Sequence, residues 1–86
     1  MAEMAAVYRI MFVCHGNICR SPMAEFILKD MAEKAGRAGQ FVIASSATST
    51  EEIRNGVGSR VYPATARELA RHGISCDGKR AVQLQR

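Results

Sequence analysis

Two cysteines and an arginine lie close together in the segment VCHGNICRSP, residues 13 to 22. Five residues separate Cys14 from Arg20, and the run follows a short apolar stretch and precedes a segment with helical periodicity. In that position, backbone N–H groups of a loop and the positive end of the following helix converge on one point, where an oxyanion binds. The planar guanidinium of Arg20 donates to two phosphate oxygens at once. The spacing therefore predicts a loop that holds a phosphate against a sulfur.

The same arrangement favours the thiolate form of Cys14. Helix N-termini and guanidinium groups lower the pKa of a cysteine well below about 8.5. Gly16 permits a tight loop, and Asn17 tolerates a left-handed backbone. Ser21 has two available roles, as the cap of the helix or as a hydrogen-bond donor to the thiolate, and the sequence leaves both open. We expect Cys14 to be a nucleophile.

Metal binding and nucleotide binding are two further interpretations of the sequence, and both are weaker. A zinc site would draw on Cys14, Cys19, His72 and Cys76. Four residues separate the first two cysteines, and Arg20 follows the second at once, which is unsuited to a zinc knuckle. The segment GISCDGK, residues 73 to 79, has the glycines and lysine of a nucleotide phosphate loop but not its strand and helix context. We expect neither a metal nor another cofactor.

Hydrophobic periodicity predicts the elements that position this loop. Residues 8 to 13 and residues 40 to 45 are short β-prone runs. Between them a helix is expected, with Ser21 and Pro22 at its start and Gly36 at its end. One face of this helix is expected to be apolar and buried: Met23, Ala24, Ile27, Leu28, Met31 and Ala35. The order strand, loop, helix, strand predicts a parallel βαβ unit.

Two ion pairs are expected on the solvated face of that helix, Glu25 with Lys29 and Asp30 with Lys34. Residues 48 to 55 form a polar connector with a capped turn at Ser49 or Thr50. A second helix is expected from Pro63 to a stop at Gly73, and residues 81 to 86 are interpreted as the start of a third. Only two strands are predicted, which is few for a parallel sheet.

Composition limits the class of protein. The chain has 86 residues with a formal net charge of +4, and 48% of its residues are hydrophobic, which predicts one folded domain. Its Lys and Arg residues are scattered, so nucleic-acid binding is not expected. Neither a signal peptide nor a membrane span is predicted. Three cysteines, an odd number, favour free thiols in a reducing cytoplasm.

The segment CHGNICRSPMAE, residues 14 to 25, resembles the active-site signature of the low-molecular-weight protein tyrosine phosphatases, C-x-G-N-x-C-R-S-P. IASSATST, residues 43 to 50, and HGISCDGKRAVQL, residues 72 to 84, extend the resemblance over nearly the whole chain. It implies an α/β fold in which a parallel βαβ unit starts a flavodoxin-like, doubly wound phosphatase domain. Residues 1 to 86 are expected to be a single partial domain of this kind, truncated after the second strand and its following helices.

The resemblance also implies roles for individual residues. Cys14 would attack phosphorus in a phosphotyrosine protein or small phosphomonoester, giving a phosphocysteine, and Arg20 would bind the phosphoryl oxygens. The second cysteine would form a protective disulfide with Cys14 on oxidation. Phosphate binding and loop support would fall to His15, Gly16, Asn17, Ile18, Cys19, Ser21 and Ser45.

The general acid of this family, an aspartate before a proline, has no counterpart in the sequence. The two aspartates are Asp30, on the first helix, and Asp77, in a turn, and neither precedes proline. Impaired phosphatase activity is therefore expected. Two alternatives stay open, an arsenate reductase on the same scaffold and an inactive phosphate-binding module. Because an uncovered strand edge invites pairing, self-association through an exposed sheet edge is also expected.

Overall fold

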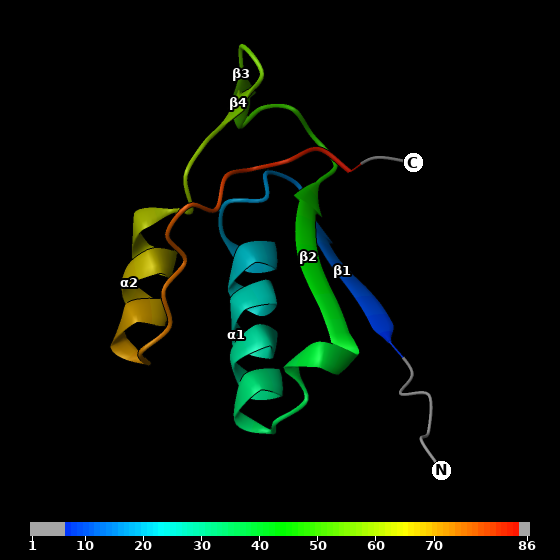
Figure 1. Cartoon of the computed structure of the whole chain (residues 1–86). Helices are drawn as coiled ribbons and strands as arrows, with labels where there is room; N and C mark the ends of the chain where they lie inside the picture. The colour runs from blue at the N-terminus through cyan, green and yellow to red at the C-terminus, as the bar shows by residue number, and fades with distance from the viewer. Residues whose placement is uncertain (1–6, 85–86) are drawn as a thin grey trace.

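The structure is a computed structural model that describes residues 7–84. Its first elements, in chain order, are β1 (Tyr8–Cys14), α1 (Arg20–Lys34), a 3-10 turn (Ala38–Gln40) and β2 (Phe41–Ala47). The two strands are parallel, and Cys14 at the end of β1 lies opposite Ala47 at the end of β2. Helix α1 runs alongside this pair (Figure 1). The βαβ unit predicted from periodicity is confirmed.

The remaining elements are β3 (Ile53–Arg54), β4 (Val57–Gly58) and α2 (Pro63–Arg71). Strands β3 and β4 form a small antiparallel hairpin that was not predicted; β3 lies in the predicted polar connector of residues 48 to 55, and β4 follows it. Its two turn residues, Asn55 and Gly56, have φ angles of 52° and 76°. A two-residue turn of type I′ needs positive φ at both positions, and Asn-Gly is the dipeptide that provides it most readily. The predicted second helix is confirmed as α2.

The buried face of α1 differs from the predicted apolar stripe. Its buried residues are Ser21, Pro22, Glu25 and Ala32. Met31, predicted to be buried, is 58% exposed, whereas Glu25, predicted on the solvated face, is 4% exposed. The prediction was wrong because hydropathy does not show which groups will neutralise a buried charge. The carboxylate of Glu25 is surrounded by such groups. The predicted pair of Lys34 with Asp30 is present at 2.8 Å.

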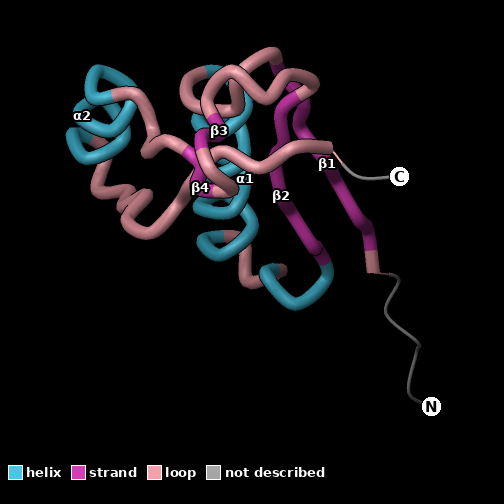
Figure 2. Tube along the Cα trace, turned by 90° about the horizontal axis from the view of Figure 1, so that it is seen from above, coloured by secondary structure: helices cyan, strands magenta, loops and turns pink. Residues whose placement is uncertain are grey.

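The carboxyl-terminal segment is extended over residues 81–84, so the predicted third helix is wrong within the described residues; residues 85 and 86 lie outside them. Ala47 donates its N–H to the carbonyl of Val82 at 2.6 Å and accepts the N–H of Leu84 at 2.7 Å. These bonds place the segment beside the end of β2, where Gln83 forms a parallel bridge with Ala47. Figure 1 shows this segment at the upper end of β2, and Figure 2 shows it crossing over that strand when the molecule is seen from above.

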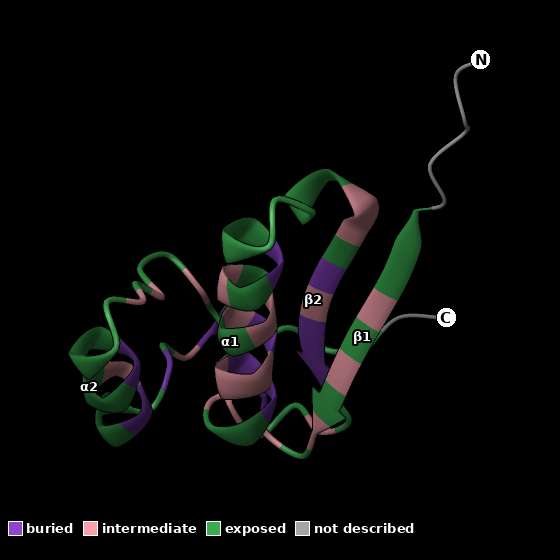
Figure 3. Ribbon diagram, turned by 90° about the horizontal axis from the view of Figure 1, so that it is seen from below, coloured by how far each residue is buried: buried purple, intermediate pink, exposed green. Residues whose placement is uncertain are grey.

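The core lies between α1, β2 and α2 and is small. Its buried apolar residues include Ala32, Ile43, Ala47, Val61, Leu69 and Ala81. Figure 3 shows α1 and β2 buried where they face each other, with β1 mostly exposed at the sheet edge. Met11, Val13 and Val42 are exposed by 51%, 44% and 52%. Within residues 7–84, every helix is too short or too polar to span a bilayer.

Candidate active site

The site lies at the carboxyl ends of the two parallel strands. Cys14 is the last residue of β1 and Arg20 is the first residue of α1, so the loop of residues 15–19 joins them directly. Both residues line one shallow hollow of about 230 Å³, together with Phe12, Val13, Ser21 and Ala24. Cys14 and Arg20 therefore share a hollow at the start of the helix, as the spacing predicted.

The sulfur of Cys14 is surrounded by hydrogen-bond donors. Its Sγ lies 3.0 Å from Oγ of Ser21 and accepts the backbone N–H of Asn17 at 3.2 Å. Partial burial acts to raise the pKa of Cys14, but the Ser21 hydroxyl and the backbone N–H groups of Ser21, Asn17 and Gly16 outweigh it. The pKa therefore lies below its ordinary value, because these donors stabilise the negatively charged thiolate.

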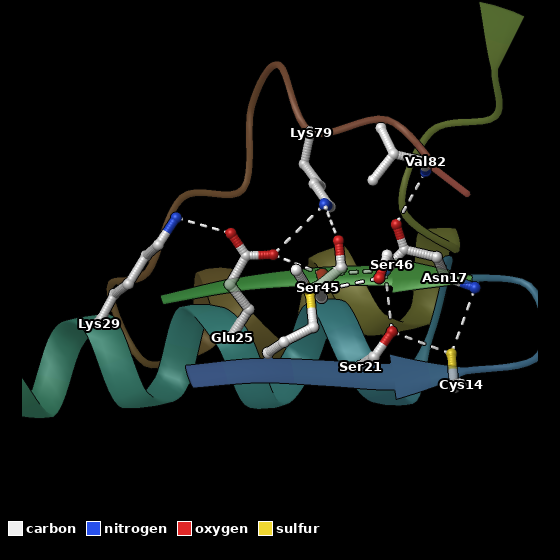
Figure 4. Close-up of polar contacts among 10 residues, drawn as sticks. Cys14, Asn17, Ser21, Glu25, Lys29, Ser45, Ser46, Lys79 and Val82 are labelled. Atoms are coloured by element: carbon white, nitrogen blue, oxygen red, sulfur yellow. Dashed lines mark hydrogen bonds and ion pairs between the residues drawn. The ribbon is translucent and has the colours of Figure 1, made fainter. Parts of the chain in front are cut away.

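The direction of each hydrogen bond around Asn17 follows from one backbone contact (Figure 4). Val82 donates its N–H to Oδ1 of Asn17 at 3.0 Å, which identifies the opposite end of the amide as the donor. Nδ2 then donates to Oγ of Ser21 at 2.8 Å and to Oγ of Ser45 at 2.9 Å. Since the Ser21 oxygen accepts from Asn17, its own proton is left to point at the sulfur of Cys14.

Glu25, one turn after Ser21 on α1, extends this hydrogen-bond network. It accepts a hydrogen bond from Oγ of Ser45 at 2.5 Å and from Nζ of Lys29 at 2.6 Å. Nζ of Lys79 lies 3.4 Å from the same carboxylate and donates to the carbonyl of Ser45 at 3.1 Å. Burial acts to raise the pKa of Glu25, but the bonds from Lys29 and Ser45 and the charge of Lys79 lower it overall. The ionised carboxylate makes Ser45 a donor, which leaves its oxygen to accept from Asn17.

Other predicted loop residues contribute backbone shape. Asn17 has a φ of 57°, the left-handed conformation that its residue type was expected to tolerate. The carbonyl of Ile18 accepts the N–H of Tyr62 at 2.6 Å, which ties the loop to the start of α2. Cys19 is exposed and its Sγ accepts a hydrogen bond from Oγ1 of Thr65 at 3.2 Å. In the described part of the chain all three cysteines are free thiols.

The structure separates the two roles that the sequence left open for Ser21. Cys19 occupies the cap position of α1, and Ser21 lies inside the helix with its hydroxyl at the sulfur of Cys14. Glu25 was missed as a site residue, although a signal was available: residues four apart on a helix share a face, and Glu25 follows Ser21 by four. Lys79 and Val82 had no such signal, because a distant loop brings them to the site.

The four residues considered as zinc ligands do not form a site in the structure. Among residues 7–84, no three His, Cys, Asp or Glu side chains are grouped so that they could hold a metal ion. His72 lies at the end of α2, where its Nε2 is 3.2 Å from a carboxylate oxygen of Glu68. Cys76 lines hollows beside α2 that do not include Cys14.

The fold and the loop together define an α/β protein with a cysteine-containing loop at the carboxyl ends of parallel strands. A family model described as low molecular weight phosphotyrosine protein phosphatase matches residues 9–86. The chain therefore belongs to the low molecular weight phosphotyrosine protein phosphatase family. The family expected from the signature is confirmed.

Individual relatives agree with this assignment. The chain is 43% identical over 75 residues to the low molecular weight protein-tyrosine-phosphatase YfkJ of Bacillus subtilis, covering 87% of this chain and 46% of that protein. It is 47% identical over 70 residues to a Streptomyces coelicolor protein of the same description, covering 81% of this chain and 40% of the relative.

Solved structures give the same result for the fold. The crystal structure of YfkJ superposes with a TM-score of 0.82 at 40% identity, covering 93% of this chain and 48% of that one. A Streptococcus pyogenes low molecular weight protein tyrosine phosphatase gives 0.78 at 35% identity, covering 92% and 48%. The chain thus spans about half the length of the relatives it matches.

Proposed function

We propose that this chain carries the nucleophile and phosphate-binding loop of a phosphatase that hydrolyses phosphotyrosine or a related phosphomonoester through a phosphocysteine. One observation carries the proposal: the Sγ of Cys14 receives donors from Ser21 and Asn17 and lines the same hollow as Arg20. A thiolate at a helix N-terminus, in the same hollow as an arginine, is suited to attack a bound phosphate.

The proposed reaction has two steps. The phosphate binds to loop N–H groups and to Arg20, and Sγ of Cys14 forms a bond to phosphorus while the bond to the leaving oxygen breaks. Water then attacks the phosphocysteine, releasing inorganic phosphate and returning the thiolate. Ser21 stabilises the sulfur before the first step and again as it departs in the second. No metal enters either step.

The leaving oxygen also needs a proton, and neither aspartate of this chain is placed to give it. Asp30 pairs with Lys34 on α1, and Asp77 lines a hollow beside α2. General acid catalysis typically contributes roughly 10²–10⁴-fold, so we expect slow turnover of phosphotyrosine. A good leaving group such as p-nitrophenolate needs less protonation and should show activity first.

Turnover of p-nitrophenyl phosphate by wild type, Cys14→Ser and Cys76→Ser tests the proposal. We expect activity in wild type and Cys76→Ser and none in Cys14→Ser. Equal activity in all three would reject Cys14 as the nucleophile. Cys76 is the matched control because it is a half-buried thiol outside the hollow that Cys14 lines.

A phosphate-binding module without turnover is the second candidate, since the anion loop is formed while the proton donor is not among these residues. Calorimetric titration with phosphate or vanadate distinguishes the two, because binding without turnover favours the module. An arsenate reductase would need a further thiol to relay electrons from Cys14. Cys76, the spare thiol, lines hollows that do not include Cys14, which favours phosphoryl chemistry.

Two wider predictions belong with this function. A thiolate nucleophile requires a reducing compartment, so we propose the cytoplasm. Self-association is proposed through β1, whose outer edge is unpaired among the described residues. The other edge of the sheet is bridged at Ala47 by Gln83. Light scattering should show a mass that rises with protein concentration, and a constant monomer mass would contradict this proposal.

A further inference from the structure

The segment that follows β2 folds back over the loop that carries the nucleophile. Thr48 donates its N–H to the carbonyl of Cys14 at 3.0 Å, and Ser49 donates to the carbonyl of His15 at 3.0 Å. Oγ of Ser49 accepts the N–H of Glu51 at 3.0 Å. This side-chain turn fixes the backbone position of Glu51. Residues 48–51 are therefore attached to the start of the loop that carries Cys14. We call the side chains of His15, Glu51 and Glu52 beside it the mouth of the site.

The side chains at this mouth are charged. Nε2 of His15 lies 2.9 Å from a carboxylate oxygen of Glu51, and the two side chains are 64% and 70% exposed. Glu52 lies on the same side, because a Cβ placed on Gly16 would be 3.1 Å from its Cγ. His15 directly follows Cys14 in the chain, so these groups lie beside the loop to which a phosphorylated segment would bind.

The mouth and the loop thus differ in charge. The loop offers Arg20 and backbone N–H groups, whereas the mouth offers two carboxylates and one imidazole. Two carboxylates against one imidazole leave the mouth with net negative charge whether or not the imidazole carries a proton. Residues flanking the phosphate therefore meet net negative charge.

We propose that Glu51, held by His15, makes the site selective for phosphorylated segments with a lysine or arginine next to the phosphorylated residue. This inference rests on the proposed phosphate-binding function of the loop. A cationic neighbour would be attracted to the carboxylates, and an acidic neighbour would be repelled. Because these groups are exposed, the effect is modest, and we expect affinities to differ by roughly three- to tenfold.

The test compares two phosphotyrosine peptides that differ only in lysine or glutamate beside the phosphotyrosine. Their dissociation constants are measured by fluorescence anisotropy on the full chain carrying Cys14→Ser, which cannot turn the peptides over through this thiol. We expect tighter binding of the lysine peptide, and the preference should shrink as salt is added. Adding Glu51→Gln should reduce the ratio of the two dissociation constants toward one. Glu33→Gln removes an exposed charge from α1 instead and should leave this ratio unchanged.

The outcomes separate this inference from the proposed function. Equal binding of both peptides, or a ratio unaffected by Glu51→Gln, overturns the selectivity even if wild type hydrolyses p-nitrophenyl phosphate. No measurable binding of either peptide overturns it as well. Selective binding without any turnover by wild type would support the selectivity and reject the hydrolytic function.

Discussion

Replacing Glu25 by glutamine tests whether a buried charge organises the site. The carboxylate is 4% exposed and bonds Ser45, Lys29 and Lys79. Glutamine keeps the volume but removes the charge, so the ammonium of Lys79, whose side chain is 12% exposed, loses its ion pair and keeps its hydrogen bond to the carbonyl of Ser45. The amide can also present its NH₂ group to Ser45, which reverses the donor that Asn17 depends on.

The magnitude follows from the burial of each partner. Breaking a fully buried ion pair costs about 3–5 kcal/mol. Lys29 is 44% exposed and regains hydration on losing its partner, so its share is small. We therefore expect Glu25→Gln to lower the free energy of unfolding by about 2–3 kcal/mol. A chain of this size has only about 4–13 kcal/mol in total, so the loss should be readily measured.

Urea unfolding followed by circular dichroism measures this loss. Glu33→Gln is the matched control, because the same change at an exposed position of α1 should stay within about 0.5 kcal/mol of wild type. The double variant Glu25→Gln with Lys79→Met should recover part of the loss, since it removes the uncompensated ammonium as well. A Glu25→Gln variant as stable as Glu33→Gln would refute the account of Glu25 as the anchor.

Three further predictions follow from individual contacts. Ser21→Ala should raise the pKa of Cys14, because a donor to the thiolate is lost; the pH dependence of iodoacetamide alkylation should move upward, and an unchanged profile would contradict the assigned bond. The pKa of Glu25 is lowered in the folded state, so its stabilisation should be present above an ordinary carboxyl pKa of about 4.3 and be lost as pH falls through the folded value. Acid titration of stability should show this loss in wild type and not in Glu25→Gln. Gly58→Ala should lower the free energy of unfolding by about 1–3 kcal/mol, because the added Cβ would lie 1.9 Å from the carbonyl oxygen of Ala81. A variant that unfolds in urea like wild type would disprove this close packing.

The sequence predicted the parts of the fold that depend on local signals. The β-prone run of residues 8 to 13, which the structure extends by one residue to Cys14, the left-handed stops at Gly36 and Gly73 and the turn at Ser49 are all present. These features need only neighbours in the chain, since strand propensity, glycine conformation and side-chain turns act over a few residues. The loop between Cys14 and Arg20 was predictable for the same reason.

The parts that were missed depend on contacts between distant residues. Glu25 is buried because Lys79, far along the chain, approaches its carboxylate. Residues 81–84 are extended because Ala47 offers backbone partners at the end of β2. Val82 reaches the site through its backbone N–H, which its side-chain type does not reveal. Periodicity carries no information about such pairings, so it placed Glu25 in solvent and a helix at the end of the chain.

The most direct test of the central claim is the mass of the protein after a reaction with p-nitrophenyl phosphate is quenched in acid. A phosphocysteine at Cys14 predicts one added phosphoryl group on wild type and on Cys76→Ser, mapped to the peptide that contains residue 14, and none on Cys14→Ser. A phosphoryl group on Cys14→Ser, or one mapped to another residue of wild type, would contradict the claim that this loop carries the nucleophile.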